Sequence, residues 1–194
     1  MERTKDLKAD PKALAAAEAK QEGKRLAGEY LADPTAVDFQ ARFSAMAKDR
    51  REAAREGAFD VFVSRIQLPT SAVAQPESEL APVADGLKAL NVVPFGEKKI
   101  QATFEQLVGF LARYIEDAKR VEDAIRKQYA PRLKAKEQEM SARMGRPVRI
   151  DPMQDPDFAA FYKQNVGQMR DQYQAALDQA KADLARLCGL AKDD

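Results

Sequence analysis

The feature that most constrains the fold is a run of apolar residues from position 100 to 125, spaced alternately four and three residues apart. This heptad pattern places one apolar stripe along a single α-helix and is typical of left-handed coiled coils. Beyond position 125 the steps lengthen into eleven-residue repeats, which relax the supercoil towards straight or right-handed packing. The stripe consists of Ile100, Phe104, Leu107, Leu111, Tyr114, Ala118, Val121, Ile125, Tyr129, Leu133, Lys136 and Met140.

Gly145 and Pro147 follow this series and favour a helix end, so we expect one helix of roughly 48 residues, kinked at Pro131. A second apolar series with the same eleven-residue period begins at Phe158. Two such helices joined by a short loop predict an antiparallel hairpin with its turn near Asp151. The predicted neighbours across the hairpin are Met140 and Tyr162, Leu133 and Met169, Tyr129 and Tyr173, and Ile125 and Leu177.

The N-terminal region, residues 1–67, predicts two shorter helices. One runs from about Pro11 to Leu31 and has few large apolar residues, so we expect it to dock weakly. The other follows Asp33 as far as Ile66, and small residues at its centre would let another helix approach closely or else mark poor packing. A proline-rich connector over 68–96 contains a short helix, and 97–194 form the hairpin. We therefore predict a single all-α domain over 1–194, with the N-terminal helices packed at the base of the hairpin.

Asp-Pro pairs precede several of these helical patterns, as at Asp155-Pro156. Aspartate is a preferred helix N-cap, and proline is favoured at the next position. The alternative is a cation site formed by Asp151, Asp155 and Asp157. An EF-hand loop would need glycine where Pro156 stands and glutamate where Tyr162 stands, so we favour capping.

The end of the predicted hairpin is rich in cations, with eight basic residues and two acidic ones between positions 124 and 149. Such a surface would hold phosphates or an acidic partner. Alternatively, these charges pair with acids of residues 151–194, and the nearby methionines fill a corner of the core. The candidate partner-binding residues are Arg132, Arg143, Arg146, Arg149, Met144 and Met153.

Composition argues against catalysis, because the chain contains no histidine, one cysteine and scattered glycines, and carries a net charge of +1. We expect no enzyme activity, no cofactor and no metal. Cys188 falls in the apolar series of the last helix, which predicts a small core residue. The first ten residues lack the apolar core of a signal peptide, and no run is long enough to span a membrane, so we expect a cytoplasmic protein.

The stretch "KQYAPRLKAKEQEMSARMGRPVRIDPMQDPDFAAFY", with "RDQYQAALDQAK" after it, resembles an uncharacterised family of helical proteins from bacterial genomes. The resemblance covers roughly the last third of the chain and implies a hairpin but no chemistry. We hypothesise a non-catalytic structural or protein-interaction module that self-associates. The alternative function is binding of an anionic polymer such as nucleic acid, or of an acidic protein, through the basic end.

Overall fold

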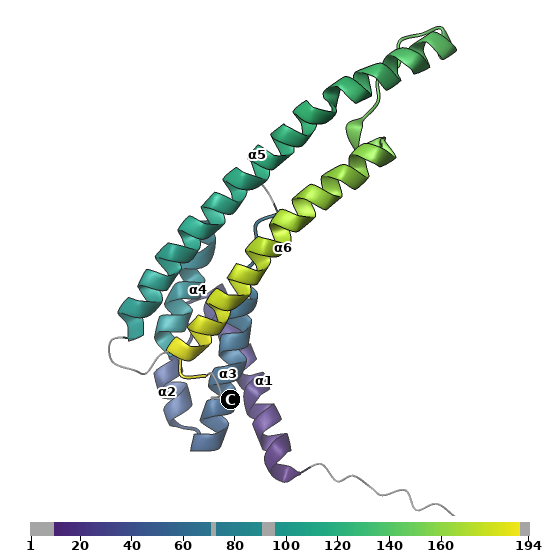
Figure 1. Cartoon of the computed structure of the whole chain (residues 1–194). Helices are drawn as coiled ribbons and strands as arrows, with labels where there is room; N and C mark the ends of the chain where they lie inside the picture. The colour runs from purple at the N-terminus through teal and green to yellow at the C-terminus, as the bar shows by residue number, and fades with distance from the viewer. Residues whose placement is uncertain (1–9, 71–72, 91–95, 191–194) are drawn as a thin grey trace, which may run out of the picture. The chain divides into compact units, whose positions relative to one another are not determined.

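The computed structural model describes residues 10–70, 73–90 and 96–190, and every regular element within these ranges is a helix (Figure 1). The prediction of an all-α fold is confirmed. Residues 71–72 and 91–95 of the predicted connector lie outside the described residues. The elements are α1 (Pro11–Ala32), α2 (Phe39–Ser44), α3 (Lys48–Ser64), α4 (Pro76–Leu90), α5 (Gly96–Met144), the short 3-10 helix η1 (Pro152–Gln154) and α6 (Pro156–Leu187).

The chain divides into two compact units. Unit 1 contains α1 to α4, α5 as far as Val108 and α6 from Ala180. Unit 2 contains the remainder of α5 and α6, within Gly109–Gln179, together with Leu68–Ala74. The prediction of a single domain over 1–194 stays a prediction.

Within unit 1, α1 and α3 cross at two glycines. A Cβ atom added to Gly57 would lie 2.0 Å from the carbonyl oxygen of Lys20, and one added to Gly23 would lie 1.8 Å from that of Ala54. No side chain fits at such distances, so the crossing requires glycine at both positions. The predicted close approach of another helix is confirmed, and the expectation of weak docking for α1 is wrong, since Leu26 and Ala27 are completely buried.

The prediction of one helix between Asp33 and Ile66 is also wrong, because the chain breaks between α2 and α3. The guanidinium group of Arg51 stabilises the break: its Nε donates to the carbonyl oxygen of Phe43 at 2.9 Å and one Nη donates to that of Met46 at 3.1 Å. The carbonyl oxygen of Phe43 also accepts from the backbone N–H of Met46 at 3.1 Å, so side-chain and backbone donors together hold the end of α2. Asp38 caps α2, whereas the carboxylate of Asp33 accepts from the backbone N–H of Thr35 at 2.9 Å and caps no helix there.

Arg55 of α3 connects two helix ends in unit 1. Its guanidinium donates to the carbonyl oxygen of Leu90 at 3.2 Å and to that of Cys188 at 3.0 Å, at the C-terminal ends of α4 and α6. A cation is favoured there by the helix dipoles. Cys188 is fully buried, as predicted, and this desolvation raises the pKa of its thiol to about 11.

The glycine crossing leads to a direct test of what holds unit 1 together. We expect Gly57→Ala to lower the free energy of unfolding by more than about 2 kcal/mol, because the new Cβ must push apart two helix backbones. Gly28→Ala is the matched control: it lies in α1 with no atom within 4 Å of the added Cβ. This control should stabilise by up to about 1 kcal/mol through helix propensity. Urea unfolding followed by circular dichroism measures both, and equal stability of the two variants would refute the crossing.

Candidate functional site

The segments of α5 and α6 in unit 2 run antiparallel and pack through aromatic side chains. The ring of Tyr129 lies 5.2 Å from that of Phe158, and Tyr114 lies 5.1 Å from Tyr173, measured between centroids. Ile125 joins Tyr129 and Phe158 in a buried cluster. The partly buried side chains packed against this cluster are Val121, Leu133, Phe161, Tyr162 and Val166.

These contacts correct the predicted register. Tyr129 was expected beside Tyr173, but it contacts Phe158, a residue 15 positions earlier in α6 (173 − 158 = 15). The displacement is about four helical turns, or roughly 22 Å at 1.5 Å per residue. Ile125 likewise belongs to the cluster around Phe158, and the predicted pairing of Ile125 with Leu177 is wrong.

The error arises from the connection between the helices, which folds back along α5. The backbone N–H of Val148 donates to Ser141 Oγ, and that of Ile150 donates to Glu137 Oε1, both at 2.9 Å. The chain thus runs back beside the last turns of α5 before α6 begins. Gly145, with φ of 63°, supplies the left-handed residue that ends α5, as predicted.

Asp155 fixes the point at which α6 starts. Its carboxylate accepts from the backbone N–H of Phe158 at 3.0 Å, which confirms the predicted N-cap. The same carboxylate accepts from Lys136 Nζ at 2.6 Å and from the Tyr129 hydroxyl at 3.3 Å, and the side chain is only 5% exposed. The hydrogen bond from Lys136, together with that from Phe158 N–H, lowers the pKa of Asp155 below its ordinary value of 3.8.

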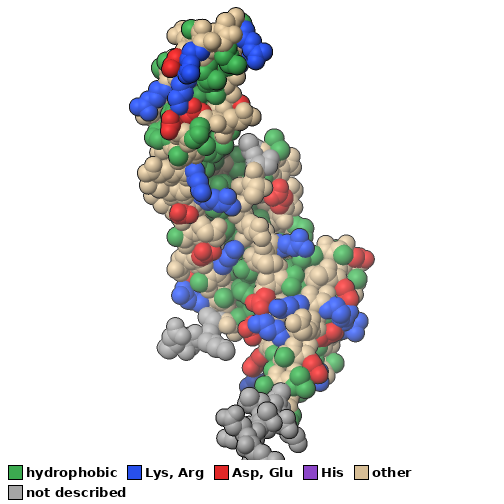
Figure 2. Space-filling model, turned by 90° about the vertical axis from the view of Figure 1, so that its right-hand side faces the viewer, with side chains coloured by type: hydrophobic (Ala, Val, Ile, Leu, Met, Phe, Trp, Pro, Cys, Tyr) green, Lys and Arg blue, Asp and Glu red, His purple; other side chains and the backbone are tan. Residues whose placement is uncertain are grey.

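The fold-back leaves the last turns of α5 and the connection as an end of unit 2, which we call the tip: residues 136–155. Three methionines of the tip are large exposed apolar side chains: Met140 is 41% exposed, Met144 52% and Met153 49%. Met140 also lines a hollow of about 420 Å³ with Val148, Arg149 and Ile150. At the upper end of Figure 2, where Figure 1 draws the tip, hydrophobic side chains lie among basic ones. Such apolar exposure is typical of binding surfaces.

The structure separates the predicted partner-binding residues into two groups. Arg132 lies over the ring of Tyr129, 5.7 Å from its centroid, and does not line the hollow. The other five, Arg143, Met144, Arg146, Arg149 and Met153, belong to the tip and are exposed.

Charge pairing involves only some of the basic residues between positions 124 and 149. Lys136 pairs with Asp155 and with Asp157, at 2.6 and 2.9 Å. Within the described part of the chain, the guanidinium groups of Arg143, Arg146 and Arg149 form no salt bridge, and neither do the tip carboxylates of Glu137, Glu139 and Asp151, so three unpaired cations and three unpaired acids share the tip. Charge pairing therefore accounts for Lys136, and binding of phosphates or an acidic partner by the three arginines stays a prediction.

Sequence reasoning missed the role of Lys136, although the sequence contains a signal for it. Lys136 occupies a position of the apolar stripe where a hydrophobic residue is expected. A cation at such a position requires a partner close to the core, because an unpaired buried charge is costly. Asp155 and Asp157 are the acids that meet this requirement.

The described residues were examined for metal-binding clusters and for helices that could cross a membrane. Over 10–70, 73–90 and 96–190, no group of three or more acidic or cysteine side chains is arranged to hold a metal ion. None of the helices described there combines the length and apolarity that crossing a bilayer requires. What the structure does define, over the described residues, is an all-helical protein in which three of the five large exposed apolar side chains, Met140, Met144 and Met153, lie near three unpaired arginines at one end of unit 2.

Comparison with protein families matches residues 40–186 to a family of unknown function, DUF6657, and the chain belongs to that family. The match extends well beyond the last third of the chain, where the sequence resemblance to an uncharacterised family was found. Searches of curated proteins and of solved structures gave no match. The family assigns no activity to the chain.

The position of Asp155 predicts a pH-dependent stability. Because the pKa of Asp155 is lower in the folded chain than its ordinary value of 3.8, its stabilising contribution is complete above that value and is lost as pH falls through the folded pKa. We expect Asp155→Ala to lower the melting temperature more than Asp155→Asn, since Asn keeps a capping acceptor but loses the ion pair with Lys136.

The matched control is Asp157→Asn, which removes only the exposed partner of Lys136. Melting curves between about pH 6 and about pH 2 should show the difference between wild type and Asp155→Asn shrinking on acidification. A difference that does not change with pH, or an effect of Asp157→Asn as large as that of Asp155→Asn, would contradict this account.

Proposed function

We propose that the protein is a non-catalytic interaction module that binds an acidic protein segment carrying apolar side chains, and that it does so through the tip. The observation that carries the proposal is the combination of Met140, Met144 and Met153, each at least 41% exposed, with three arginines that have no acidic partner among the described residues. Methionine is flexible and polarisable, and it is common at surfaces that adapt to a partner. Arginine is enriched at protein interfaces as well.

A protein partner is favoured over nucleic acid by the side chains around the hollow. Single-stranded nucleic acids are held by aromatic side chains on which bases stack. The described lining of the tip hollow is aliphatic and charged, with Met140, Val148 and Ile150 beside Arg149 and without an aromatic ring. Its charged members are Lys136, which pairs with Asp155, together with Glu139 and Arg149, so Arg149 is the cation that would face a carboxylate of the partner.

The proposal also concerns the two helices, α5 and α6, that carry the tip. We propose that α5 and α6 form a long, coiled-coil-like antiparallel hairpin, supported in unit 2 by the ring contacts of Tyr114 and Tyr129. A cytoplasmic location is also part of the proposal. It is supported by cysteine usage, since Cys188 is free and buried and the sequence has no disulfide framework.

The test uses fluorescently labelled synthetic helical peptides and the whole protein. We expect a peptide with leucines on one face and glutamates on the other to bind, with affinity reduced at least about tenfold by Arg143→Glu with Arg149→Glu, because like charges then face each other. The matched control is Lys119→Glu with Lys127→Glu, which makes the same change in net charge elsewhere on α5 of unit 2. Fluorescence anisotropy measures each affinity.

Two further probes distinguish a protein partner with apolar side chains from an anionic polymer. A glutamate-only peptide should bind more weakly than the amphipathic one, because it has no side chain to bury against the methionines. A single-stranded DNA that binds more tightly than both peptides, with an affinity falling steeply as salt rises, would favour the anionic-polymer function instead. Equal loss of peptide binding in the tip variant and the control variant would contradict the proposed site.

A further inference from the structure

The one cysteine of the chain is protected from oxidants. Cys188 is completely buried, and this desolvation raises the pKa of its thiol to about 11. Oxidants such as peroxides react with the thiolate form, which is scarce at neutral pH when the pKa is raised in this way. Methionine thioethers need no deprotonation, so their exposure decides which of them an oxidant reaches first.

The methionines of the described residues fall into two classes of exposure. Met46 in unit 1 and Met169 on α6 are half-buried. The methionines of the tip are exposed, and these are Met140, Met144 and Met153. Met1 lies outside the described residues. The most exposed sulfur-containing side chains of the described chain therefore belong to the surface that the proposed function uses.

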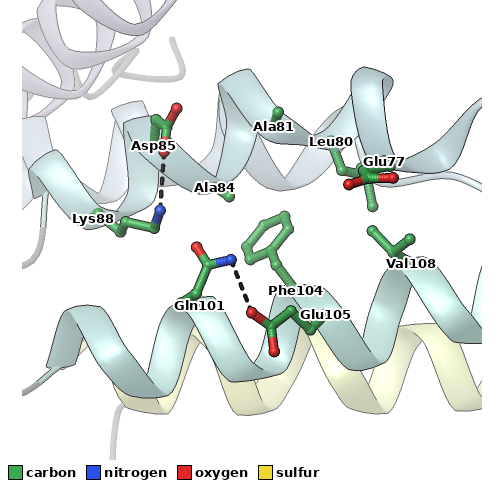
Figure 3. A pocket seen from close by; sticks show the side chains of 10 residues that line it. All are labelled: Glu77, Leu80, Ala81, Ala84, Asp85, Lys88, Gln101, Phe104, Glu105 and Val108. Carbon is green, nitrogen blue, oxygen red and sulfur yellow. Dashed lines mark hydrogen bonds and ion pairs between the residues drawn. The ribbon is translucent and has the colours of Figure 1, made fainter.

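The hollow of the tip differs in this respect from a groove of about 480 Å³ between α4 and the first turns of α5 in unit 1. Figure 3 shows the ten side chains that line this groove, and none of them contains sulfur. Its floor at Leu80, Ala84 and Phe104 is buried. Met140, in contrast, lines the tip hollow. An oxidant therefore has a target in the tip hollow and none in the lining of the groove.

Oxidation by a peroxide changes a methionine side chain from apolar to polar. The thioether sulfur attacks one peroxide oxygen, and the O–O bond breaks as the S–O bond forms. The departing hydroxide then takes the proton from the transferred oxygen and leaves as water. Sulfur loses two electrons and the peroxide gains them. The product is a sulfoxide, whose oxygen is a hydrogen-bond acceptor that the thioether lacked.

Arginines without a salt bridge lie close to where the new oxygen forms. Met140 and Arg149 line the same hollow, and Met140 and Arg143 are three positions apart on α5, which makes them neighbours on the helix surface. Neither guanidinium forms a salt bridge within the described residues, so each has donors to offer a sulfoxide oxygen at Met140. Oxidation thus removes an apolar contact from the tip and engages a cation that would otherwise face the partner.

We propose that the exposed methionines of the tip are a peroxide-sensitive modification site, whose oxidation to sulfoxides releases the bound partner and whose reduction restores binding. The inference rests on the proposed function, since it states how binding at the tip is regulated. Reduction takes two reductases, one for each sulfoxide epimer. The thiol reductant supplies the electrons: two thiols become a disulfide, and the sulfoxide oxygen leaves as water.

The test treats the whole protein with hydrogen peroxide and removes the peroxide before binding is measured. Proteolytic digestion with mass spectrometry should find the added oxygen at the tip methionines before Met46 and Met169. The affinity for the peptide of leucines and glutamates should fall at least about tenfold, because a polar sulfoxide buried against leucine is unfavourable. Incubation with both reductases and dithiothreitol should restore the affinity. Circular dichroism should show that folding is retained, since the buried cluster of Ile125, Tyr129 and Phe158 contains no methionine.

Two variants assign the effect to particular methionines, each compared with itself before and after peroxide. Met46→Leu with Met169→Leu should lose affinity on oxidation as wild type does. A chain with Met140→Leu, Met144→Leu and Met153→Leu should keep whatever affinity it starts with. Oxidation of Met46 and Met169 as fast as the tip methionines, or a wild-type affinity that peroxide leaves unchanged, overturns the inference while the proposed function stands. If untreated wild type does not bind the peptide at all, the proposed function fails and the inference with it.

Discussion

The position of the Asp155 carboxylate determines how unit 2 is built. It accepts the first N–H groups of α6 and the ammonium group of Lys136 on α5, so one side chain both starts a helix and fixes its register on the neighbouring helix. Breaking a pair of this kind leaves a charge without its partner, which opposes sliding of α6 along α5. The aromatic contacts of Tyr129 with Phe158 follow from that register.

The local features of the chain were predictable from sequence, because they depend on neighbouring residues. Asp155 caps α6, Gly145 ends α5 in the left-handed region, and the single apolar stripe requires a helix close to the 49 residues observed. The register was not predictable in this way. It depends on the path of the connection, and hydrogen bonds from Val148 and Ile150 to side chains of α5 fold that path back. Because the two helices have the same apolar period, their stripes match at several displacements along the helix axis. The period alone does not select one of them.

Unit 1 shows a second reason why sequence reasoning fails. Docking strength was judged by the number of large apolar residues in α1, yet the helix is held by a backbone crossing that large residues would prevent. Leu14, one of the few large apolar residues of α1, is 54% exposed, whereas the small residues Ala19 and Ala27 are buried. Close approach brings many atoms into contact without large side chains, so an alanine- and glycine-rich helix packs well when its partner matches it.

The candidate site follows from the register rather than from any motif. Had the helices paired symmetrically about Asp151, Tyr162 would cover Met140, and the methionines would belong to the core. Because α6 instead starts beside Lys136, the final turns of α5 have only the connection beside them, and its half-buried Val148 and Ile150 leave Met140 and Met144 exposed. The same pairing joins Lys136 to Asp155 and Asp157 and leaves Arg143, Arg146 and Arg149 unpaired within the described residues. One capping carboxylate thus determines which apolar side chains of the tip stay exposed and which of its arginines stay unpaired.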